Sequence, residues 1–180
     1  YNLMNIKKFV YKSVNSTNDI AIKLIKKSKI KAGLIVSEKQ KKGRGQRGKK
    51  WISHKGNLFA TIFFSLDKNN LTIKELTKMN ANLIIKLISF YCKEKITLKK
   101  PNDILINKKK VCGILQEIVQ RKEIKYLVVG IGLNLIKSPN ITNYPTTNLY
   151  KLTNVKISVS NVSKKLILIY MNFLKSKKFF

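Results

Sequence analysis

The sequence contains few of the residues from which metal sites and disulfide frameworks are built. Its 180 residues include two cysteines, Cys92 and Cys112, and one histidine, His54. The two cysteines lie far apart in the chain, so they form neither a ligand pair nor a framework of the kind that staples small secreted domains. We therefore exclude a zinc site and expect no resident metal. Cys112 is interpreted as a packed strand residue and His54 as a turn residue.

Long apolar runs and a secretory signal are also missing. The longest apolar runs, Leu58 to Phe64 and Leu166 to Met171, are far shorter than the roughly 18 residues that a membrane-spanning helix needs. No charged region followed by an apolar segment and a cleavage site opens the chain. We expect a cytoplasmic protein without a membrane segment. Its length and its 44% apolar content suit one domain over residues 1–180.

Acidic residues are scarce, with eight against 38 basic residues and a formal net charge of +30. Such an excess is typical of proteins that bind nucleic acid. However, only Arg44, Arg47 and Arg121 are arginines, and the lysines are scattered over the whole chain. A phosphate-binding footprint clusters and favours arginine. A non-enzymatic basic nucleic-acid-binding protein therefore stays open as an alternative that charge alone supports.

Hydrophobic periodicity predicts the order of the secondary-structure elements. Alternating or short apolar runs predict strands over Phe9–Val14, Gly33–Ser37, Asn57–Leu66, Ile96–Leu98, Ile104–Ile106, Val111–Val119 and Tyr126–Ile131. Apolar spacings of three and four predict helices from Ser16-Thr17-Asn18 to Lys29, over Ile73–Lys93 and over Val159–Leu174. Tight polar turns join the later strands as in a meander. This order predicts an α+β fold with a mixed, largely antiparallel sheet flanked by helices.

The sharpest motif is the run Gly43-Arg44-Gly45-Gln46-Arg47-Gly48-Lys49-Lys50-Trp51, at the end of a long polar stretch. It formally satisfies the dinucleotide fingerprint G-x-G-x-x-G, but a turn and a strand follow it instead of a helix, which excludes that reading. Backbone N–H groups and guanidinium groups in such a loop can bind a phosphate, and the tryptophan can cover the ligand. A mobile basic surface loop is the alternative.

Three further motifs combine polar residues with glycine or proline. Lys99-Lys100-Pro101-Asn102-Asp103 places Lys99 at a strand end, from which it can project into a cleft or simply into solvent. The other two are Lys110-Val111-Cys112-Gly113-Ile114-Leu115-Gln116-Glu117 and Gly130-Ile131-Gly132-Leu133-Asn134. Glycines inside strands often mark the close approach of a ligand or of another backbone, although bulges and tight packing explain them equally well.

Together with Ser16-Thr17-Asn18 and Gln40, these motifs resemble, in this order, the biotin–protein (biotin–[acetyl-CoA-carboxylase]) ligases over about residues 9–150. The resemblance implies a catalytic domain related to the class II aminoacyl-tRNA synthetases and to lipoate ligases. It also implies two half-reactions. Biotin and MgATP give biotinyl-5′-AMP and pyrophosphate, and a lysine of a biotin carboxyl carrier protein then attacks the mixed anhydride.

The resemblance further assigns roles to individual residues. Lys99 and Arg44 would be the catalytic cations, and the only metal would be the Mg²⁺ that accompanies ATP. Biotin would be bound by Ser16, Thr17, Asn18, Gln40, Arg44, Gly45, Gln46, Lys99, Gly113, Ile114 and Leu115. The nucleotide would be bound by Arg44, Arg47, Trp51, Lys99, Asn102 and Asn134. These types suit the task, because a neutral ureido ring needs polar partners and the meeting of a carboxylate with a phosphate needs cations.

The sequence departs from the family at several positions. Lys100 stands where tryptophan is usual, Cys112 stands where a small residue is usual, and Gln46 replaces an arginine, which removes a cation and predicts faster release of the adenylate. No helix-turn-helix precedes residue 9, so neither specific DNA binding nor a repressor role is expected. The 46 residues after Asn134 leave little room for the family's small C-terminal β-domain, which we expect to be absent or truncated.

The sequence leaves two points open, the oligomeric state and the acyl substrate. A homodimer is compatible with the resemblance but is not indicated by any motif. A lipoate or octanoate ligase or transferase on the same fold is the main alternative enzyme. The arginine-containing loop and the polar set Ser16, Thr17, Asn18 and Gln40 speak against it, because a fatty acyl tail has nothing for these groups to bond.

Overall fold

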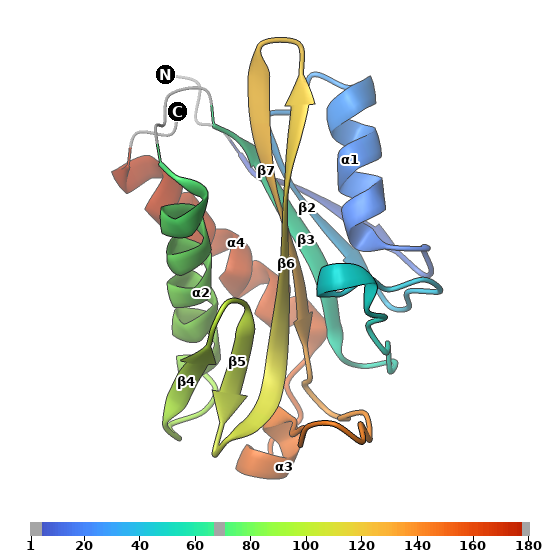
Figure 1. Cartoon of the computed structure of the whole chain (residues 1–180), viewed down its shortest axis with the longest axis vertical. Helices are drawn as coiled ribbons and strands as arrows, with labels where there is room; N and C mark the ends of the chain where they lie inside the picture. Colours follow the sequence, from blue (N-terminus) through green and yellow to red (C-terminus); the bar gives the residue numbers. More distant parts are fainter. Residues whose placement is uncertain (1–4, 67–70, 178–180) are drawn as a thin grey trace.

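The fold is built on one seven-stranded sheet, seen in a computed structural model that describes residues 5–66 and 71–177 (Figure 1). The strand order is β1-β2-β3-β7-β6-β5-β4, in which β1 and β2 are parallel and all other neighbours are antiparallel. The predicted α+β fold with a mixed, largely antiparallel sheet is confirmed. The strands are β1 (Lys7–Tyr11), β2 (Ala32–Ser37), β3 (Leu58–Ser65), β4 (Ile96–Lys99), β5 (Asp103–Ile106), β6 (Lys109–Arg121) and β7 (Ile124–Leu133).

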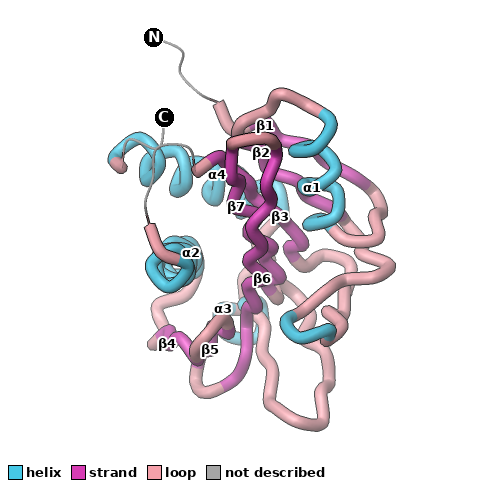
Figure 2. Tube along the Cα trace, turned by 45° about the horizontal axis from the view of Figure 1, so that its top comes forward, coloured by secondary structure: helices cyan, strands magenta, loops and turns pink. Residues whose placement is uncertain are grey.

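Helices cover both faces of this sheet. Helix α1 (Thr17–Lys27) packs on one face against β2, β3 and β7, whereas α2 (Ile73–Ser89) and α4 (Val159–Ser176) pack against each other on the opposite side (Figure 2). The described part also contains a short helix α3 (Leu149–Thr153) and a 3₁₀ turn η1 (Gln46–Gly48). Strand β3 is buried on both faces, as its apolar sequence predicts: Phe64 lies in the core under α2 and α4, and Phe63 lies in the core under α1.

Helix α2 begins with a reciprocal capping box. The Thr72 hydroxyl accepts a hydrogen bond from the Glu75 N–H, and the Glu75 carboxylate accepts one from the Thr72 N–H at 2.8 Å. These bonds to the charged form lower the pKa of Glu75. The helix ends at Ser89, before the predicted Lys93, because the carbonyl of Ile88 accepts from both Tyr91 and Cys92 and closes the last turn.

Element ends differ from the predictions where tertiary contacts decide them. Strand β1 stops at Tyr11, and Val14 forms only an isolated bridge with Gln40. This bridge has a functional consequence, because it brings the N-terminus of α1 beside the loop that follows β2. Neither α3 nor η1 was expected, because each is too short to show a period. Helix α1 ends at Lys27 instead of Lys29, whereas α4 extends to Ser176.

The predicted meander is confirmed for β4 to β7. Asn107 and Lys108 have φ of 50° and 61°, as expected for a two-residue hairpin turn between β5 and β6. Strand β6 pairs with β7 along most of its length, with Gly113 opposite Gly132. Two of the sequence motifs therefore lie side by side in the middle of the sheet.

Candidate functional site

All sequence-predicted site residues except Asn134 line one cavity of about 430 Å³. The cavity lies among the N-terminus of α1, the loop between β2 and β3, the β4–β5 turn and the strands β6 and β7. Its predicted members are Ser16, Thr17, Asn18, Gln40, Arg44, Gly45, Gln46, Arg47, Trp51, Lys99, Asn102, Gly113, Ile114 and Leu115. Asn134 lies in a small adjoining hollow that shares Trp51 with the cavity. The size is typical of a small-molecule site.

The N-terminus of α1 provides the polar wall of the cavity. Ser16 is the N-cap, and its side chain makes no capping hydrogen bond. Thr17 donates its N–H (2.9 Å) and its hydroxyl (3.2 Å) to Oε1 of Gln40. The buried hydroxyl of Thr61 lies 2.8 Å from Thr17 Oγ1 and 2.6 Å from Asn18 Oδ1. Protein partners therefore orient these side chains before any ligand binds.

Asn18 is held on all sides by the protein. Its Oδ1 contacts Thr61, and its Nδ2 donates to the carbonyl of Leu115 (3.3 Å) and to Glu117 (2.7 Å). Its side chain occupies the space that a Cβ at Gly130 would fill, since such an atom would lie 2.4 Å from Asn18 Oδ1. Asn18 thus shapes the cavity wall, with its amide groups already engaged.

Two other motif glycines make room for Trp51. A Cβ at Gly132 would lie 2.3 Å from the indole, and a Cβ at Gly113 would lie 2.6 Å from it. The ring therefore rests directly on the paired backbones of β6 and β7. Tight packing therefore explains these two glycines, because Trp51 lies against them. The same glycines also shape the cavity, because Trp51 forms part of its wall.

The loop that contains the arginines folds back on itself. Gly45 donates its N–H to the Lys49 carbonyl (2.7 Å), and Trp51 donates its N–H to the Gly43 carbonyl (2.9 Å). The tip contains η1, where Arg47 and Gly48 have φ of 54° and 73°. Gly48 suits this left-handed conformation, and Arg47 is exposed. Such a loop presents Arg47 at the mouth of the cavity.

Arg44 is paired with two carboxylates. Its guanidinium lies 2.8 Å from Asp19 and 2.8 Å from Glu117. The hydrogen bond that Arg44 donates to Glu117 is the main cause of a raised pKa for Arg44, and Asp19 adds to it. The resemblance assigns Arg44 to biotin and the phosphates, and the structure shows that two carboxylates also engage its guanidinium.

Lys110 is a cavity residue that the sequence reasoning missed. Its ammonium group forms an ion pair with Asp103 at 2.8 Å, and its side chain is only 13% exposed. It lies 5.3 Å from the ring centre of Trp51 and 5.1 Å from that of Tyr144. Lys99 lines the same cavity but is exposed. Lys110 is the first residue of the motif that we noted for Gly113, and its place in that motif was the sequence signal that could have identified it.

Asn102 anchors the β4–β5 turn to the site. Its carbonyl accepts from the Ile114 N–H (3.0 Å), and its Nδ2 donates to the Ile114 carbonyl (2.9 Å). The amide is therefore engaged with main-chain groups on β6. This contact lies next to Asp103, whose carboxylate reaches the Lys110 ammonium group.

Two buried polar atoms beside the cavity have no hydrogen-bond partner within the described residues. They are Oδ1 of Asn134, whose Nδ2 donates to the Thr147 carbonyl, and Nε1 of Trp51. A buried polar group without a partner costs about 1–3 kcal/mol. An unpaired acceptor and an unpaired donor at one hollow therefore indicate a ligand that supplies the opposite groups.

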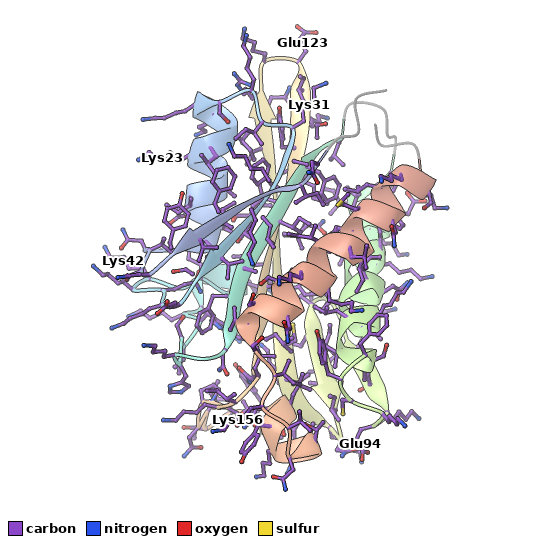
Figure 3. All side chains as sticks on the ribbon, turned by 180° about the vertical axis from the view of Figure 1, so that it is seen from behind. Lys23, Lys31, Lys42, Glu94, Glu123 and Lys156 are labelled. Carbon is purple, nitrogen blue, oxygen red and sulfur yellow. The ribbon has the colours of Figure 1, made fainter. Side chains whose placement is uncertain are left out.

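Lysines also lie on the surface outside the cavity. The labelled Lys23, Lys31, Lys42 and Lys156 project outward from different parts of the molecule (Figure 3). In the part of the chain that the structure describes, no helix is long and apolar enough to cross a membrane.

Comparison with known proteins identifies the family. The model of the biotin/lipoate A/B protein ligase family matches residues 10–134, which is more than two thirds of the chain. The chain belongs to this family. The matched segment contains the motifs around the cavity, from Ser16 to Asn134.

Individual members of the biotin/lipoate A/B protein ligase family agree with this assignment. The chain is 29% identical over 165 residues to the bifunctional ligase/repressor BirA of Bacillus subtilis, covering 87% of this chain and 50% of that protein. It is 32% identical over 129 residues to a biotin–[acetyl-CoA-carboxylase] ligase of Paracoccus denitrificans, covering 70% and 53%. The chain thus spans about half the length of the curated relatives it matches.

A solved structure supports the family fold. The biotin protein ligase of Aquifex aeolicus, in complex with biotin and ATP, superimposes with a TM-score of 0.76 at 27% identity, covering 96% of this chain and 73% of that one. The expected class II synthetase-like, biotin-ligase-like fold is confirmed.

Proposed function

We propose that this chain is the catalytic domain of an ATP-dependent biotin–protein ligase, which forms biotinyl-5′-AMP and transfers biotin to a lysine of a carrier protein. The observation that carries the proposal is the composition of one cavity. It combines a pre-oriented polar wall, a sheltered cation and an adjoining hollow with unpaired polar atoms. The Aquifex aeolicus relative, solved with biotin and ATP, supports the choice of ligands.

The polar wall suits the ureido ring of biotin. Ser16 keeps a hydroxyl without a capping bond, and Thr17 and Gln40 stand beside it in fixed orientations. A neutral ring with two N–H donors and one carbonyl acceptor is bound best by a few pre-placed polar groups in a mostly enclosed pocket. Asn18 would support this wall from behind.

We assign Lys110 as the main cation for the first half-reaction. An oxygen of the biotin carboxylate attacks the α-phosphorus of ATP, forming an O–P bond as the bond to pyrophosphate breaks. Two anions must meet, and a sheltered ammonium group stabilises the developing charge more strongly than an exposed one. Lys110 is 13% exposed, and Asp103 holds it in place. Lys99, Arg47 and the Mg²⁺ bound to ATP would act from the mouth of the cavity.

The adjoining hollow is small, about 20 Å³, and would receive only an edge of the adenine ring. Oδ1 of Asn134 can accept a hydrogen bond from the exocyclic amine, and the Trp51 indole offers a face for stacking. The exocyclic amine would therefore satisfy the Asn134 acceptor, which otherwise lacks a partner among the described residues.

The second half-reaction needs no nucleophile from this chain. The carrier's lysine amine attacks the acyl carbon of the anhydride, and AMP leaves with the electron pair of the broken C–O bond. Cys112 does not compete for this role, because it is fully buried and burial raises the pKa of its thiol. We propose a biotin carboxyl carrier protein as the acceptor.

The test is biotin-dependent exchange of labelled pyrophosphate into ATP. We expect exchange with biotin, loss of about 100-fold or more in Lys110→Gln, and nearly normal exchange in the matched control Lys109→Gln, whose side chain is exposed at the start of β6. Lys99→Ala should lower the rate less than Lys110→Gln. Exchange with lipoate or octanoate instead of biotin would favour the other branch of the family. No exchange with any of these acids would refute the proposal.

A further inference from the structure

Glu117 contacts two parts of the cavity that are far apart in the sequence. Its Oε2 accepts hydrogen bonds from Nδ2 of Asn18 (2.7 Å) and from Nη2 of Arg44 (2.8 Å), and its Oε1 accepts from Nη1 of Arg44 (3.0 Å). Asn18 belongs to the cavity wall, and Arg44 belongs to the loop that covers the cavity. The Glu117 carboxylate therefore connects the cavity wall at Asn18 to the loop that contains Arg44.

The pairing is selective in a chain with few acids. Of the eight acidic residues in the sequence, Asp19 and Glu117 both meet the Arg44 guanidinium, whereas lysines abound nearby. Glu117 is the stronger partner, because its contact with Arg44 is bidentate and its side chain is 28% exposed, against 51% for Asp19.

We infer that Glu117 is a positioning residue, which fixes the loop of residues 43–51 against the cavity through Arg44 and orients the cavity wall through Asn18. Arg44 then acts as the loop's attachment point. The catalytic charge comes from other residues. The kinetic part of this inference rests on the proposed function, whereas the loop attachment does not.

A glutamine at position 117 removes this attachment with little change in shape. Its amide nitrogen cannot accept, and in either orientation of the carboxamide it would face an N–H of Arg44, which is a donor at these contacts. The remaining oxygen can still accept from Asn18, but the bidentate contact and the ion pair with Arg44 are lost. We expect the loop to separate from the wall, with a smaller effect on Asn18.

Trp51 reports the loop directly, because it is the only tryptophan in the chain and is the last residue of the loop. In the attached state its indole rests on Gly113 and Gly132, and its Nε1 is buried. Acrylamide quenching of its fluorescence should therefore rise in Glu117→Gln without any ligand. The matched control is Glu123→Gln, which makes the same charge change at the exposed β6–β7 turn (Figure 3).

Kinetics separate positioning from chemistry. In pyrophosphate exchange, Glu117→Gln should raise the KM for biotin by about tenfold while kcat changes less, because the lost bonds to a charged group organise the site before the reaction. Arg44→Gln should show the same pattern. Lys110→Gln should mainly lower kcat. In the double variant Glu117→Gln/Arg44→Gln, the effects on quenching should not add, because both changes break one contact.

Each outcome decides the inference. Unchanged quenching in both Glu117→Gln and Arg44→Gln would overturn it, as would fully additive effects in the double variant. A rise in KM with unchanged quenching would also overturn the link to the loop. Should Glu117→Gln not fold, Arg44→Gln still tests the contact, because its side chain is 38% exposed. If the wild type shows no exchange with biotin, the proposed function fails, and the quenching results still decide the attachment.

Discussion

Replacing Gly132 with alanine should damage nucleotide binding more than it damages the fold. The added Cβ would lie 2.3 Å from Cε2 and 2.4 Å from Cζ2 of Trp51. Carbon atoms in contact are normally about 3.5–4.0 Å apart, so the ring must move by more than about 1 Å. Gly132 lies inside β7, whereas Trp51 lies in a loop and is partly exposed. The indole will therefore yield before the strand does.

The size of the effect follows from the role we propose for Trp51. Stacking of a base on an aromatic side chain contributes about 1–3 kcal/mol, which corresponds to about a 5- to 150-fold change in affinity. A displaced indole should lose much of this contact. The KM for ATP in biotin-dependent pyrophosphate exchange should rise within that range, and the fluorescence spectrum of Trp51 should shift as its ring leaves the sheet.

Gly33→Ala is the matched control for a glycine that has no ligand role. Its Cβ would lie 2.6 Å from the Phe63 ring, which is fully buried in the core under α1 and has no free direction in which to move. Such overpacking costs about 1–3 kcal/mol of stability. Gly33→Ala should lower the melting temperature and leave the KM for ATP unchanged. If Gly132→Ala instead lowered the melting temperature and left the KM for ATP unchanged, the proposed displacement of Trp51 would be refuted.

Three further predictions concern release, stability and docking. Gln46→Arg should slow release of the adenylate from the enzyme, measured by rapid filtration, because it restores a cation beside the phosphate. Equal release rates would refute this role for position 46. The hydrogen bonds from Thr72 lower the pKa of Glu75, so its contribution to stability is complete above its ordinary pKa of 4.5 and disappears as the pH falls through the lower folded value. Glu75→Ala should thus lower the melting temperature at neutral pH but not in strong acid; an equal loss at every pH contradicts this. With a net charge of +30, transfer to an acidic carrier should slow with salt while pyrophosphate exchange changes little, and a flat response of the transfer step would remove electrostatic steering.

The order of the elements could be predicted from sequence because hydrophobic periodicity reports burial directly. Strand β3 is buried on both faces and reads as a continuous apolar run, and the long helices α2 and α4 repeat their apolar positions often enough to be recognised. The same method fails where local pattern does not decide the structure. Helix α3 has five residues, and Asn148 caps it by accepting from the Lys151 N–H, a contact that no period reveals.

The site could be located from its motifs, but the partners within it could not be assigned. Arg44 was predicted to face phosphates because arginines in glycine-rich loops often do. Its carboxylate partners, Asp19 and Glu117, come from α1 and β6, far away in the sequence. Pairing of this kind depends on the register of the sheet and on the folded loop. A charge balance counted over the whole chain conceals it, because an excess of lysines says nothing about where the few acids lie.

The two candidate lysines show how register decides chemistry. Lys99 ends β4 at an edge of the sheet, so its ammonium group reaches the cavity from the solvent side. Lys110 is the second residue of the long strand β6. The neighbouring strand β5 places Asp103 opposite Gly113 and brings the Asp103 carboxylate to the Lys110 ammonium group. Between Ile104 and Leu105 the register of the β5–β6 pairing shifts. The side chains of β6 therefore do not follow the regular alternation that the sequence suggests. The alternation of residues along a strand therefore predicts that Lys99 can reach the cavity. That Lys110 is sheltered there follows only from the irregular pairing of β5 with β6. On electrostatic grounds we therefore propose the sheltered Lys110 over Lys99 as the main cation, since its charge is less screened by water.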